Sequence, residues 1–591
     1  MLGNRIAIVD KTKCDPTRCA KECMKFDPVN RSGGEGFHLG EDGKATIAQE
    51  VTTEAHQICA KKCPFEAIKI VRLPQEASGK PIHQYGENGF RLYNLPIPIF
   101  GKVVGLLGRN GIGKSTAVKI LSGLEHANLG EHTLKVDSPT YTHLIEHFKG
   151  STAQKYFEQM RDGQITVAFK PQSINAIPKQ FSGKVEELLH KITQDTDKIQ
   201  NVCTRLQLDN FLSHDIQTLS GGELQRVAIA ATVLKKANVY IFDEPSSFLD
   251  IKQRINVAKF IQELADEKTA VVVIEHDLIL LDYMADFIHL IYGNQGAYGV
   301  ISKVKTTKIG INMYLEGSLR DENIQFRQNK ISFHQRVLRD EGERLRLTQY
   351  PAMQKKLGDF SLTVKEGDIE KHTVIGILGE NGIGKSTFAK LISGVEKPDN
   401  TDNTTQVPLA YKPQYIDTTD DTLVQVYLQN AIDNYNTRLI KPLKLESLFT
   451  QELRQLSGGQ LQIVNIVKCL SEDVELYVMD EPSAYLDTEQ RLTVSKIIKD
   501  FMLETGRSAL IIDHDLLFID YLSHKIIVFD GEPAKHGAVT GPFDIQTGMN
   551  MFLKDLDLTF RRDEESHRPR ANKFGSQMDQ KQRSDNTYYY I

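Results

Sequence analysis

The sequence predicts an α/β fold in which two homologous halves follow a small cysteine-rich α+β domain. Three observations support this prediction. Four short motifs occur twice, in the same order, along the 591 residues. Strand-sized apolar runs precede the motifs in both copies. Five of the seven cysteines lie near the N-terminus, from Cys14 to Cys63.

The bulk composition is that of an ordinary globular protein, with 40% apolar and 25% charged residues. With a net charge of −5, any contact with RNA must come from local basic patches. The longest apolar runs, such as 270–274, fall far short of the roughly 20 residues that a membrane helix needs. The first ten residues lack the apolar core of a signal peptide. We therefore expect a cytoplasmic protein that does not enter a membrane.

The duplication rests on motif spacing as well as motif identity. The interval from Ser220 to Asp243 has the same length as the interval from Ser457 to Asp480. Chance does not reproduce four ordered motifs at matching intervals, so we expect two copies of a whole domain. The repeated segments are 108–116 and 379–387, 219–225 and 456–462, 242–246 and 479–483, and 275–277 and 513–515.

The first repeated motif is a glycine-rich phosphate loop that follows an apolar run and opens a helix. In such loops, backbone N–H groups converge on phosphate oxygens at a positive helix end. Lys114 and Lys385 are expected to meet the β- and γ-phosphates of ATP, and Ser115 and Ser386 to hold Mg²⁺. The remaining expected nucleotide-binding residues of these loops are Asn110, Gly111, Gly113, Thr116, Asn381, Gly382, Gly384 and Thr387.

Carboxylates end the buried strands that follow the second motif. Asp243 and Asp480 come directly after four apolar residues, so they are expected at the carboxyl edge of the sheet, supporting Mg²⁺. The adjacent Glu244 and Glu481 are the candidate general bases for an attacking water. Four further residues recur at equivalent places. They are Gln172 and Gln414, expected at Mg²⁺, and His276 and His514, expected at the γ-phosphate.

One interval breaks the symmetry between the copies. The step from Lys114 to Gln172 is twice as long as the equivalent step from Lys385 to Gln414. The extra segment, about 138–165, shows two runs of apolar residues at helical spacing, and Ser151 with Gln154 predicts a capping box. We expect a helix–loop–helix insertion. Whether it only covers the core or carries a function remains open.

The early cysteines resemble an incomplete two-cluster bacterial ferredoxin. In such domains, three cysteines of one run and the fourth of the other hold each [4Fe–4S] cluster. One complete set remains, and we predict that it retains one cluster: Cys14, Cys19, Cys23 and Cys63. The other set has a single thiolate, and we predict that its cluster is lost: Thr53, His56, Cys59 and Asp27. The alternative is that neither cluster assembles.

A ferredoxin-like head followed by two P-loop ABC-type ATPase domains, the first with an insertion, resembles the E subfamily of ABC proteins. These are ribosome-recycling factors, also called the RNase L inhibitor family. Matching segments include 95–98, 219–226, 243–250, 297–300, 310–312, 559–563 and 568–570. The resemblance implies an ATPase that splits post-termination ribosomes and stays on the small subunit. It also implies partners: the small subunit with its rRNA, a release-factor-like A-site protein, and initiation factors. We expect the chain to be a monomer.

The resemblance also implies domain bounds and site roles. The expected bounds are 1–75 for the cysteine domain, 76–292 and 336–530 for the ATPase domains, and 293–335 and 531–591 for hinges. In this fold family each signature loop completes the opposite site. Ser457 and Gly459 would serve site one, with Lys114, and Ser220 and Gly222 would serve site two, with Lys385. Tyr85 and Phe90 resemble adenine-stacking residues, with Tyr350 or Phe360 in the second copy. Six arginines are candidates for rRNA contact, and for each the alternative is a solvated surface charge or an intramolecular salt bridge: Arg320, Arg327, Arg561, Arg562, Arg568 and Arg570.

Departures from the family pattern predict unequal sites. Gln460 stands where the first copy has Glu223, and Asp513 stands where it has Glu275. Because site one uses the second signature loop, we expect site one to be the more altered. Two other classes of function remain. One is the ATPase subunit of a transporter, against which the cysteine head and the lack of membrane helices argue. The other is a ribosome-bound structural factor with vestigial hydrolysis, which the intact Glu244 and Glu481 oppose.

Overall fold

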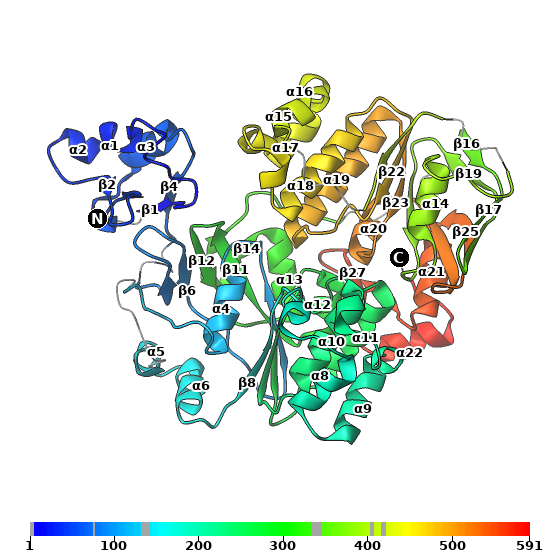
Figure 1. Cartoon of the computed structure of the whole chain (residues 1–591), viewed down its shortest axis with the longest axis horizontal. Helices are drawn as coiled ribbons and strands as arrows, with labels where there is room; N and C mark the ends of the chain where they lie inside the picture. The colour runs from blue at the N-terminus through cyan, green and yellow to red at the C-terminus, as the bar shows by residue number, and fades with distance from the viewer. Residues whose placement is uncertain are drawn as a thin grey trace.

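The computed structural model describes residues 5–74, 77, 79–131, 141–333, 345–401, 407–414 and 421–590. They form a small N-terminal domain and two larger α/β halves (Figure 1). The N-terminal domain lies beside strand β6 of the first half, and the second half packs against the first (Figure 1). None of the described helices combines the length and apolar character that crossing a bilayer demands.

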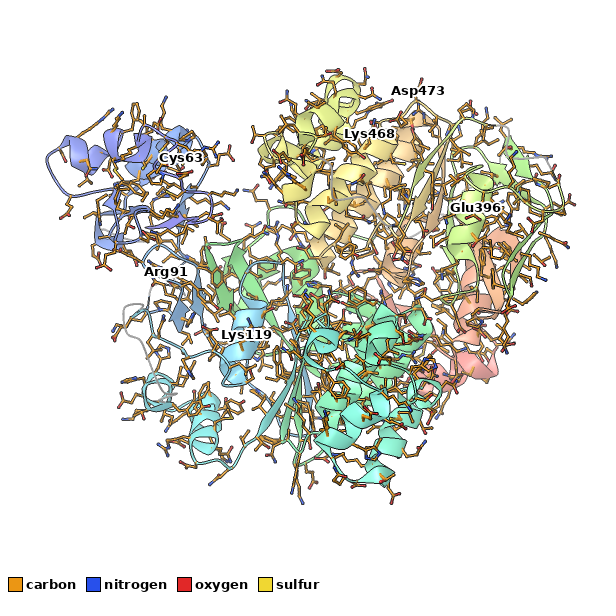
Figure 2. All side chains as sticks on the ribbon, in the orientation of Figure 1. Cys63, Arg91, Lys119, Glu396, Lys468 and Asp473 are labelled. Carbon is orange, nitrogen blue, oxygen red and sulfur yellow. The ribbon has the colours of Figure 1, made fainter. Side chains whose placement is uncertain are left out.

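The N-terminal domain is a small α+β unit, as predicted. Its core holds the fully buried Ile47 and the nearly buried Phe37 beneath a two-stranded antiparallel sheet. Asn88 joins this domain to the first half, because its side chain donates to Ala7 O and Ile47 O. Arg91 lies at the same junction (Figure 2) and donates to Gln49. The elements are β1 (Arg5–Val9), α1 (Glu22–Lys25), α2 (Pro28–Arg31), β2 (His38–Leu39), β3 (Ala45–Thr46), α3 (Gln57–Lys62) and β4 (Ile68–Arg72).

The first half is built on one mixed sheet whose central strands are parallel. Both faces of these strands are covered, which explains why they are continuous apolar runs. The strand order is β5 (His83–Gln84), β6 (Arg91–Tyr93), β12 (Tyr298–Ile301), β11 (Phe287–Asn294), β7 (Val103–Leu107), β10 (Ala270–Ile274), β9 (Val239–Asp243) and β8 (Val167–Lys170), with β13 (Lys305–Thr306) beside β11. The helices are α4 (Lys114–Leu121), α5 (Tyr141–His147), α6 (Thr152–Arg161), α7 (Ile177–Gln180), α8 (Val185–Ile192), α9 (Thr196–Arg205), α10 (Gly221–Val233), α11 (Ile251–Glu263) and α12 (Leu278–Met284).

The second half repeats this strand order, which confirms the predicted duplication. Its sheet runs β17 (Met353–Leu357), β18 (Phe360–Val364), β25 (His536–Asp544), β24 (Lys525–Glu532), β20 (Val374–Leu378), β23 (Ser508–Ile512), β22 (Leu476–Asp480) and β21 (Leu409–Lys412). A separate antiparallel pair joins β16 (Arg346–Tyr350) to β19 (Gly367–Glu370). The helices are α14 (Lys385–Ile392), α15 (Val424–Tyr427), α16 (Gln429–Tyr435), α17 (Lys441–Leu443), α18 (Gly458–Leu470), α19 (Thr488–Thr505) and α20 (Leu516–Leu522).

The predicted insertion forms the helix pair α5 and α6, although residues 138–140 lie outside the described part. Tyr156 and Phe157 are buried against the first half, and the Tyr156 hydroxyl donates to Leu121 O at 2.8 Å. The predicted capping box was wrong. Ser151 Oγ instead donates to Phe148 O, and Gln154 Oε1 accepts from the Gly150 N–H, because the tight turn brings these backbone groups closer. One face of the insertion therefore covers core.

The sheets extend further along the chain than the expected hinge bounds allow. Strand β12 pairs with β6 and β11, and β25 pairs with β18 and β24, so residues after 293 and 531 still belong to the sheets. In each sheet, β12 or β25 lies between the parallel central strands and the outer antiparallel pair, which is β5–β6 in the first half and β17–β18 in the second. Beyond them lie α13 (Thr307–Glu316), β14 (Ser318–Leu319), β15 (Ile324–Gln325), α21 (Ile545–Asp555), β26 (Phe560–Arg562), β27 (Pro569–Ala571) and α22 (Gln577–Ser584).

Candidate functional site

Each phosphate loop connects a buried central strand to a helix and curls around its own lysine. Lys114 Nζ donates to Gly108 O and Arg109 O at 2.8 Å, and Lys385 Nζ donates to Gly379 O at 2.9 Å. Burial lowers the pKa of both lysines to about 8, while nearby carboxylates act in the opposite direction. Gly113 has a φ of 97°, and a Cβ there would meet the Phe90 ring at 2.7 Å. Only glycine fits that position.

The residues expected at Mg²⁺ lie together at the carboxyl edge of the first sheet. Ser115 Oγ donates to Asp243 Oδ2 at 3.0 Å. Burial raises the pKa of Asp243, as does the neighbouring Glu244. In the second half, burial raises the pKa of Asp480, and the positive charges of Lys412 and Lys385 act in the opposite direction. A hydroxyl beside a buried carboxylate is a donor set of the hard oxygen type that Mg²⁺ prefers, so these residues fit the ion.

Glu244 is held by residues from three loops. Gln172 Nε2 donates to its Oε1 at 2.7 Å, Ser247 Oγ donates to Oε2 at 3.1 Å, and His276 Nε2 lies 3.4 Å from Oε1. Burial raises the pKa of Glu244, but His276 and Gln172 outweigh burial and bring it to about 2. The backbone of Glu244 has a φ of 48°, a region that non-glycine residues rarely adopt outside functional sites.

Glu481 repeats this geometry with different electrostatics. Its φ is 47°, Gln414 Nε2 donates to it at 2.8 Å, and His514 Nε2 lies 3.5 Å away. Burial raises its pKa, and the carboxylates of Asp513 and Asp480 raise it further. The shifts of the two glutamates are therefore opposite in direction. This difference agrees with unequal sites, and which site is the more altered stays a prediction.

The two recurring histidines are buried in equivalent places of the two halves. His276 and His514 are both 6% exposed. Within the described part of the chain, Nδ1 of neither ring has a hydrogen-bond partner. Burial lowers the pKa of His514 well below its usual value, and Lys385 lowers it further. A buried neutral ring can donate one hydrogen bond, which suits contact with a phosphate oxygen.

Sequence reasoning missed a buried lysine behind each carboxylate pair. Lys170 Nζ donates to Asp243 O at 3.0 Å and Glu244 O at 3.2 Å, and Lys412 Nζ donates to Asp480 O at 2.9 Å. Burial lowers the pKa of both to about 8. The signal was present, because a Lys-Pro-Gln triplet recurs at 170–172 and 412–414. These lysines position the strand ends that carry the acids.

We expect Lys170→Met to lower ATP turnover about tenfold or more while ATP binding is retained. The change removes the lysine donor from Asp243 O and leaves Glu244 O with Gln225 Nε2 as its side-chain donor, at the strained turn that carries Glu244. Steady-state hydrolysis and nucleotide binding of the full chain measure the two effects. The exposed Lys235→Met is the control, and equal turnover in both variants would remove Lys170 from the site.

Contacts between the halves cross from each phosphate loop to the opposite half. The Asn110 N–H donates to Asp487 Oδ2 at 3.1 Å, and the Asn381 N–H donates to Asp250 Oδ2 at 3.2 Å. Thr488 Oγ1 donates to His276 O at 2.7 Å. The halves therefore face each other head to tail. Sequence reasoning gave these two aspartates no role, although they recur at the same interval after each strand-end acid.

The signature loops cap their own helices. Ser220 Oγ accepts from the Glu223 N–H, and Ser457 Oγ accepts from the Gln460 N–H. Throughout the described ranges, no hydrogen bond or ion pair joins either serine to the opposite phosphate loop. Completion of each site by Ser220, Gly222, Ser457 and Gly459 from the opposite half stays a prediction.

The expected adenine-stacking residues differ between the halves. Tyr85 is 44% exposed, and its hydroxyl lies 3.3 Å from Thr116 Oγ1, so it borders the first phosphate loop. Phe90 and Phe360 occupy matching places, against Gly113 and Gly384. Tyr350 cannot stack on a base, because it is fully buried and its hydroxyl donates to Gly541 O.

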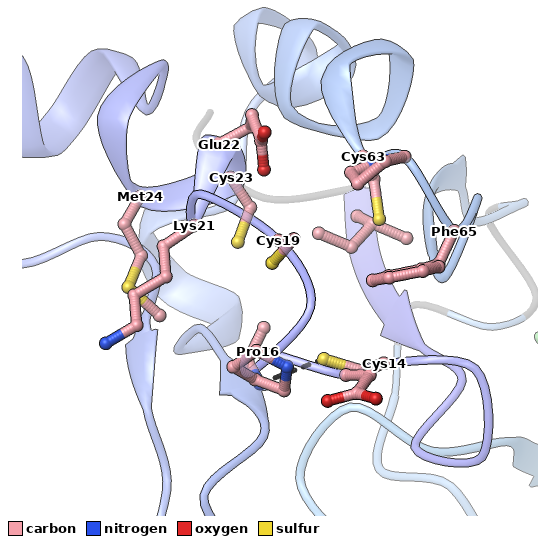
Figure 3. Close-up of a pocket in the computed structure, with 13 residues that line it drawn as sticks. Cys14, Pro16, Cys19, Lys21, Glu22, Cys23, Met24, Cys63 and Phe65 are labelled. Atoms are coloured by element: carbon pink, nitrogen blue, oxygen red, sulfur yellow. Dashed lines mark hydrogen bonds between the residues drawn. The ribbon is translucent and has the colours of Figure 1, made fainter.

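Four cysteines converge on one pocket of the N-terminal domain. Cys14, Cys19, Cys23 and Cys63 point their sulfur atoms into it (Figure 3). Burial raises the pKa of Cys23 to about 11, and the other three thiols raise it as well. Such mutual repulsion of thiolates calls for a compensating cation. The four sulfurs surround a space rather than one point, so the set fits an iron–sulfur cluster.

The second predicted set, Thr53, His56, Cys59 and Asp27, contains a buried polar network. Asp27 Oδ1 accepts from the Val29 N–H at 2.7 Å, and Oδ2 accepts from the Phe37 N–H at 2.6 Å. His56 Nε2 lies 3.5 Å from Asp27 Oδ1, and His56 Nδ1 accepts from the Thr53 N–H. Burial raises the pKa of Cys59 to about 12, and Asp27 raises it further.

Four of the arginines considered for rRNA contact are held by internal partners. Arg568 is fully buried and donates to Asp282 at 2.9 Å, and Arg570 pairs with the same carboxylate. Arg562 donates to the buried Asp520 at 2.8 Å. Arg327 donates to backbone carbonyls of α13. For Arg562, Arg568 and Arg570 the structure shows the intramolecular salt bridge, the alternative that the sequence left open. The Arg320 side chain is 73% exposed.

We expect Asp282→Asn to destabilise the C-terminal segment by about 3–5 kcal/mol, because it leaves Arg568 buried without a counter-charge. Native-state hydrogen exchange of β26 and β27 measures the loss. The exposed Asp557→Asn, which weakens a surface pair with Arg583, should cost less than about 1 kcal/mol. Equal protection in both variants would contradict a structural role for Asp282.

Comparisons with known proteins agree with this architecture. Residues 99–247 and 359–484 match the ABC transporter family model, and residues 5–35 match a possible Fer4-like domain in RNase L inhibitor. The chain is 47% identical, over 99% of its length and 98% of the relative, to an ABC transporter ATP-binding protein of Methanocaldococcus jannaschii. It is 41% identical, over 100% of its length and 98% of the relative, to translation initiation factor RLI1 of Saccharomyces cerevisiae.

Two solved structures are similarly close in sequence. A model of ribosome-bound archaeal Pelota and ABCE1 contains a chain of 46% identity and TM-score 0.90, with full coverage of both chains. The archaeal ribosome recycling factor aABCE1, solved with the ribosomal stalk protein aP1, has 47% identity and TM-score 0.83 over 87% of this chain and 99% of that one. The chain therefore belongs to the E subfamily of ABC proteins, the family of RLI1 and ABCE1.

Proposed function

We propose that this chain binds and hydrolyses ATP at two sites between its halves. We further propose that it uses the resulting closure to split post-termination ribosomes, after which it stays on the small subunit. The head-to-tail contacts of Asn110 with Asp487 and of Asn381 with Asp250 carry the proposal, because they place each phosphate loop against the other half. The printed names of the relatives support it, since they include a translation initiation factor and a ribosome recycling factor.

The chemistry follows from residues that are already in place. Lys114 and Lys385, at present bonded to loop carbonyls, would turn to the β- and γ-phosphates. Ser115 with Asp243, and Ser386 with Asp480, would hold Mg²⁺, which neutralises charge that develops on the phosphates. Glu244 and Glu481 would orient the attacking water and accept its proton, and His276 and His514 would donate to the γ-phosphate.

Closure would arise because the γ-phosphate bonds to both halves at once. Ser457 and Gly459 would reach the nucleotide held by Lys114, and Ser220 and Gly222 the one held by Lys385. A ligand shifts an equilibrium only through its different affinity for two states, and contacts on both sides of the γ-phosphate provide that difference. Its loss on hydrolysis would then release the halves.

The cofactor inventory of the proposal is ATP, Mg²⁺ and one [4Fe–4S] cluster. Convergence of Cys14, Cys19, Cys23 and Cys63 on one pocket supports the retained cluster. The Asp27–His56 network supports loss of the second cluster, because its buried hydrogen bonds occupy the position of that cluster's predicted ligands. Proposed partners are the small subunit with its rRNA, a release-factor-like A-site protein and initiation factors. The chain would act as a cytoplasmic monomer.

Ribosome splitting by the purified chain tests the proposal. Post-termination ribosomes, a release-factor-like protein and the chain are mixed with ATP or a non-hydrolysable analogue, then sedimented through a sucrose gradient. We expect free subunits. In the reaction with the non-hydrolysable analogue, we expect the chain to sediment with the small subunit. Intact ribosomes despite active ATP hydrolysis would refute the splitting function. Ribosome binding with no hydrolysis would favour a structural factor instead.

A further inference from the structure

One pair of contacts between the two halves is the same on both sides of the pseudo-twofold axis. Asp250 and Asp487 each accept from the matching phosphate-loop N–H group of the opposite half. Such contacts do not distinguish a first half from a second half. Two first halves from different chains could use them as well as the first and second halves of one chain.

Two ion pairs break this equivalence. At site two, Lys252 Nζ at the start of α11 donates to Glu380 Oε1 at 2.7 Å. At site one, Arg109 Nε lies 3.5 Å from Glu489 Oε2 at the start of α19. Arg109 and Glu380 are the same loop position, directly after the first glycine, and Lys252 and Glu489 are the same helix position, shortly after the aspartate. The pairs are thus equivalent in place and opposite in sign.

We propose that these charge-swapped pairs, Lys252–Glu380 and Arg109–Glu489, are the specificity determinants that direct each half to the other half of its own chain. Pairing of two first halves would set Lys252 against Arg109 twice. Pairing of two second halves would set Glu489 against Glu380 twice. Like charges in contact disfavour the wrong partner, while the intramolecular arrangement satisfies all four groups.

The side chains are well placed for this role. Lys252 and Glu380 are 43% and 25% exposed, and Arg109 and Glu489 are 49% and 21% exposed, so water screens the pairs only in part. The hydrogen bond with Glu380 raises the pKa of Lys252. Arg327 Nη1 also lies 3.6 Å from Glu489 Oε2, so Glu489 has a second basic neighbour. For this reason the test leaves Glu489 unchanged and replaces Glu380 of site two in both variants.

The test compares two full-length double variants that share one change and have the same net charge as the natural chain. Arg109→Glu with Glu380→Lys makes both intramolecular pairs like-charged and makes both like-half pairings attractive. Lys252→Glu with Glu380→Lys keeps both intramolecular pairs attractive. The two variants differ only in where the compensating glutamate stands. Closure is measured as retention of a labelled non-hydrolysable ATP analogue, and self-association by sedimentation velocity over a wide range of protein concentrations.

We expect Arg109→Glu with Glu380→Lys to retain nucleotide about tenfold less and to self-associate as its concentration rises. Lys252→Glu with Glu380→Lys should match the natural chain and stay monomeric, since the tether gives its own halves a millimolar effective concentration. Natural behaviour of the first variant overturns the proposal. Equal impairment of the second also overturns it, because residue 380 would then act on nucleotide directly.

The inference rests on ATP-driven closure as proposed above. The experiment distinguishes a failure of the charge pairing from a failure of the proposed function. If the natural chain retains nucleotide and splits ribosomes while both variants match it, only the charge pairing is wrong. If the natural chain itself shows no nucleotide-dependent closure, the proposed function is wrong. In that case, self-association of the first variant without nucleotide still reports on the pairing preference.

Discussion

Replacing Glu244 and Glu481 together with glutamine is expected to lower ATP turnover at least ~100-fold while nucleotide binding persists. General-base contributions of that size are usual, and glutamine keeps the shape that Gln172 and Gln414 contact but cannot take a proton. Because the γ-phosphate then stays in place, the chain should accumulate on small subunits in the closed state. Phosphate release and gradient sedimentation measure the two effects.

The single variants, Glu244→Gln and Glu481→Gln, measure how much each site contributes to ATP turnover. The pKa of Glu244 is lowered to about 2 and that of Glu481 is raised, so the two sites need not contribute equally to turnover. The exposed Glu504→Gln, on α19, controls for loss of a carboxylate elsewhere. Turnover that survives in the double variant would exclude both glutamates as the proton acceptors.

Replacing Cys63 with serine is expected to reduce the iron content from about four atoms per chain to none. Cys63 completes the set with Cys14, Cys19 and Cys23, and its loss leaves three thiols around the pocket. Iron and acid-labile sulfide on anaerobically purified protein, together with the visible absorption of the cluster, measure the loss.

Cys59→Ser is the matched control, because Cys59 is a buried cysteine of the same domain outside that pocket. We expect it to keep about four irons. Eight irons in the natural chain would contradict the loss of the second cluster. Equal loss of iron in both variants would contradict the assignment of ligands, and no iron in the natural chain would mean that neither cluster assembles.

The fold could be predicted to a large extent because phosphate loops and strand-end acids must follow apolar strands. The two sheets have the same strand order because the two halves are copies of one domain. The hinge bounds could not be placed, since β12 and β25 belong to the sheets partly through pairing with strands much earlier in the chain, β6 and β18. Pairing over such sequence distances leaves little local signal.

The functional residues that belong to repeated motifs were predicted, whereas those that depend on distant partners were not. Lys114, Glu244 and Gln172 lie together as their motifs predicted. Burial of charge was not predictable from motif or composition. Lys170 was overlooked and the role of Arg568 stayed open, because in both cases the deciding partner, Asp243 or Asp282, lies far away in the chain.

The start of α19 gives the two ATP sites a common boundary. Asp487 and Thr488 touch Asn110 and His276 of site one, yet they follow Glu481 of site two after only a short turn. Six residues of chain thus connect Glu481 of site two to the side chain that contacts the phosphate loop of site one. We therefore expect the two sites to be coupled through this segment, so that the nucleotide state of one affects the geometry of the other.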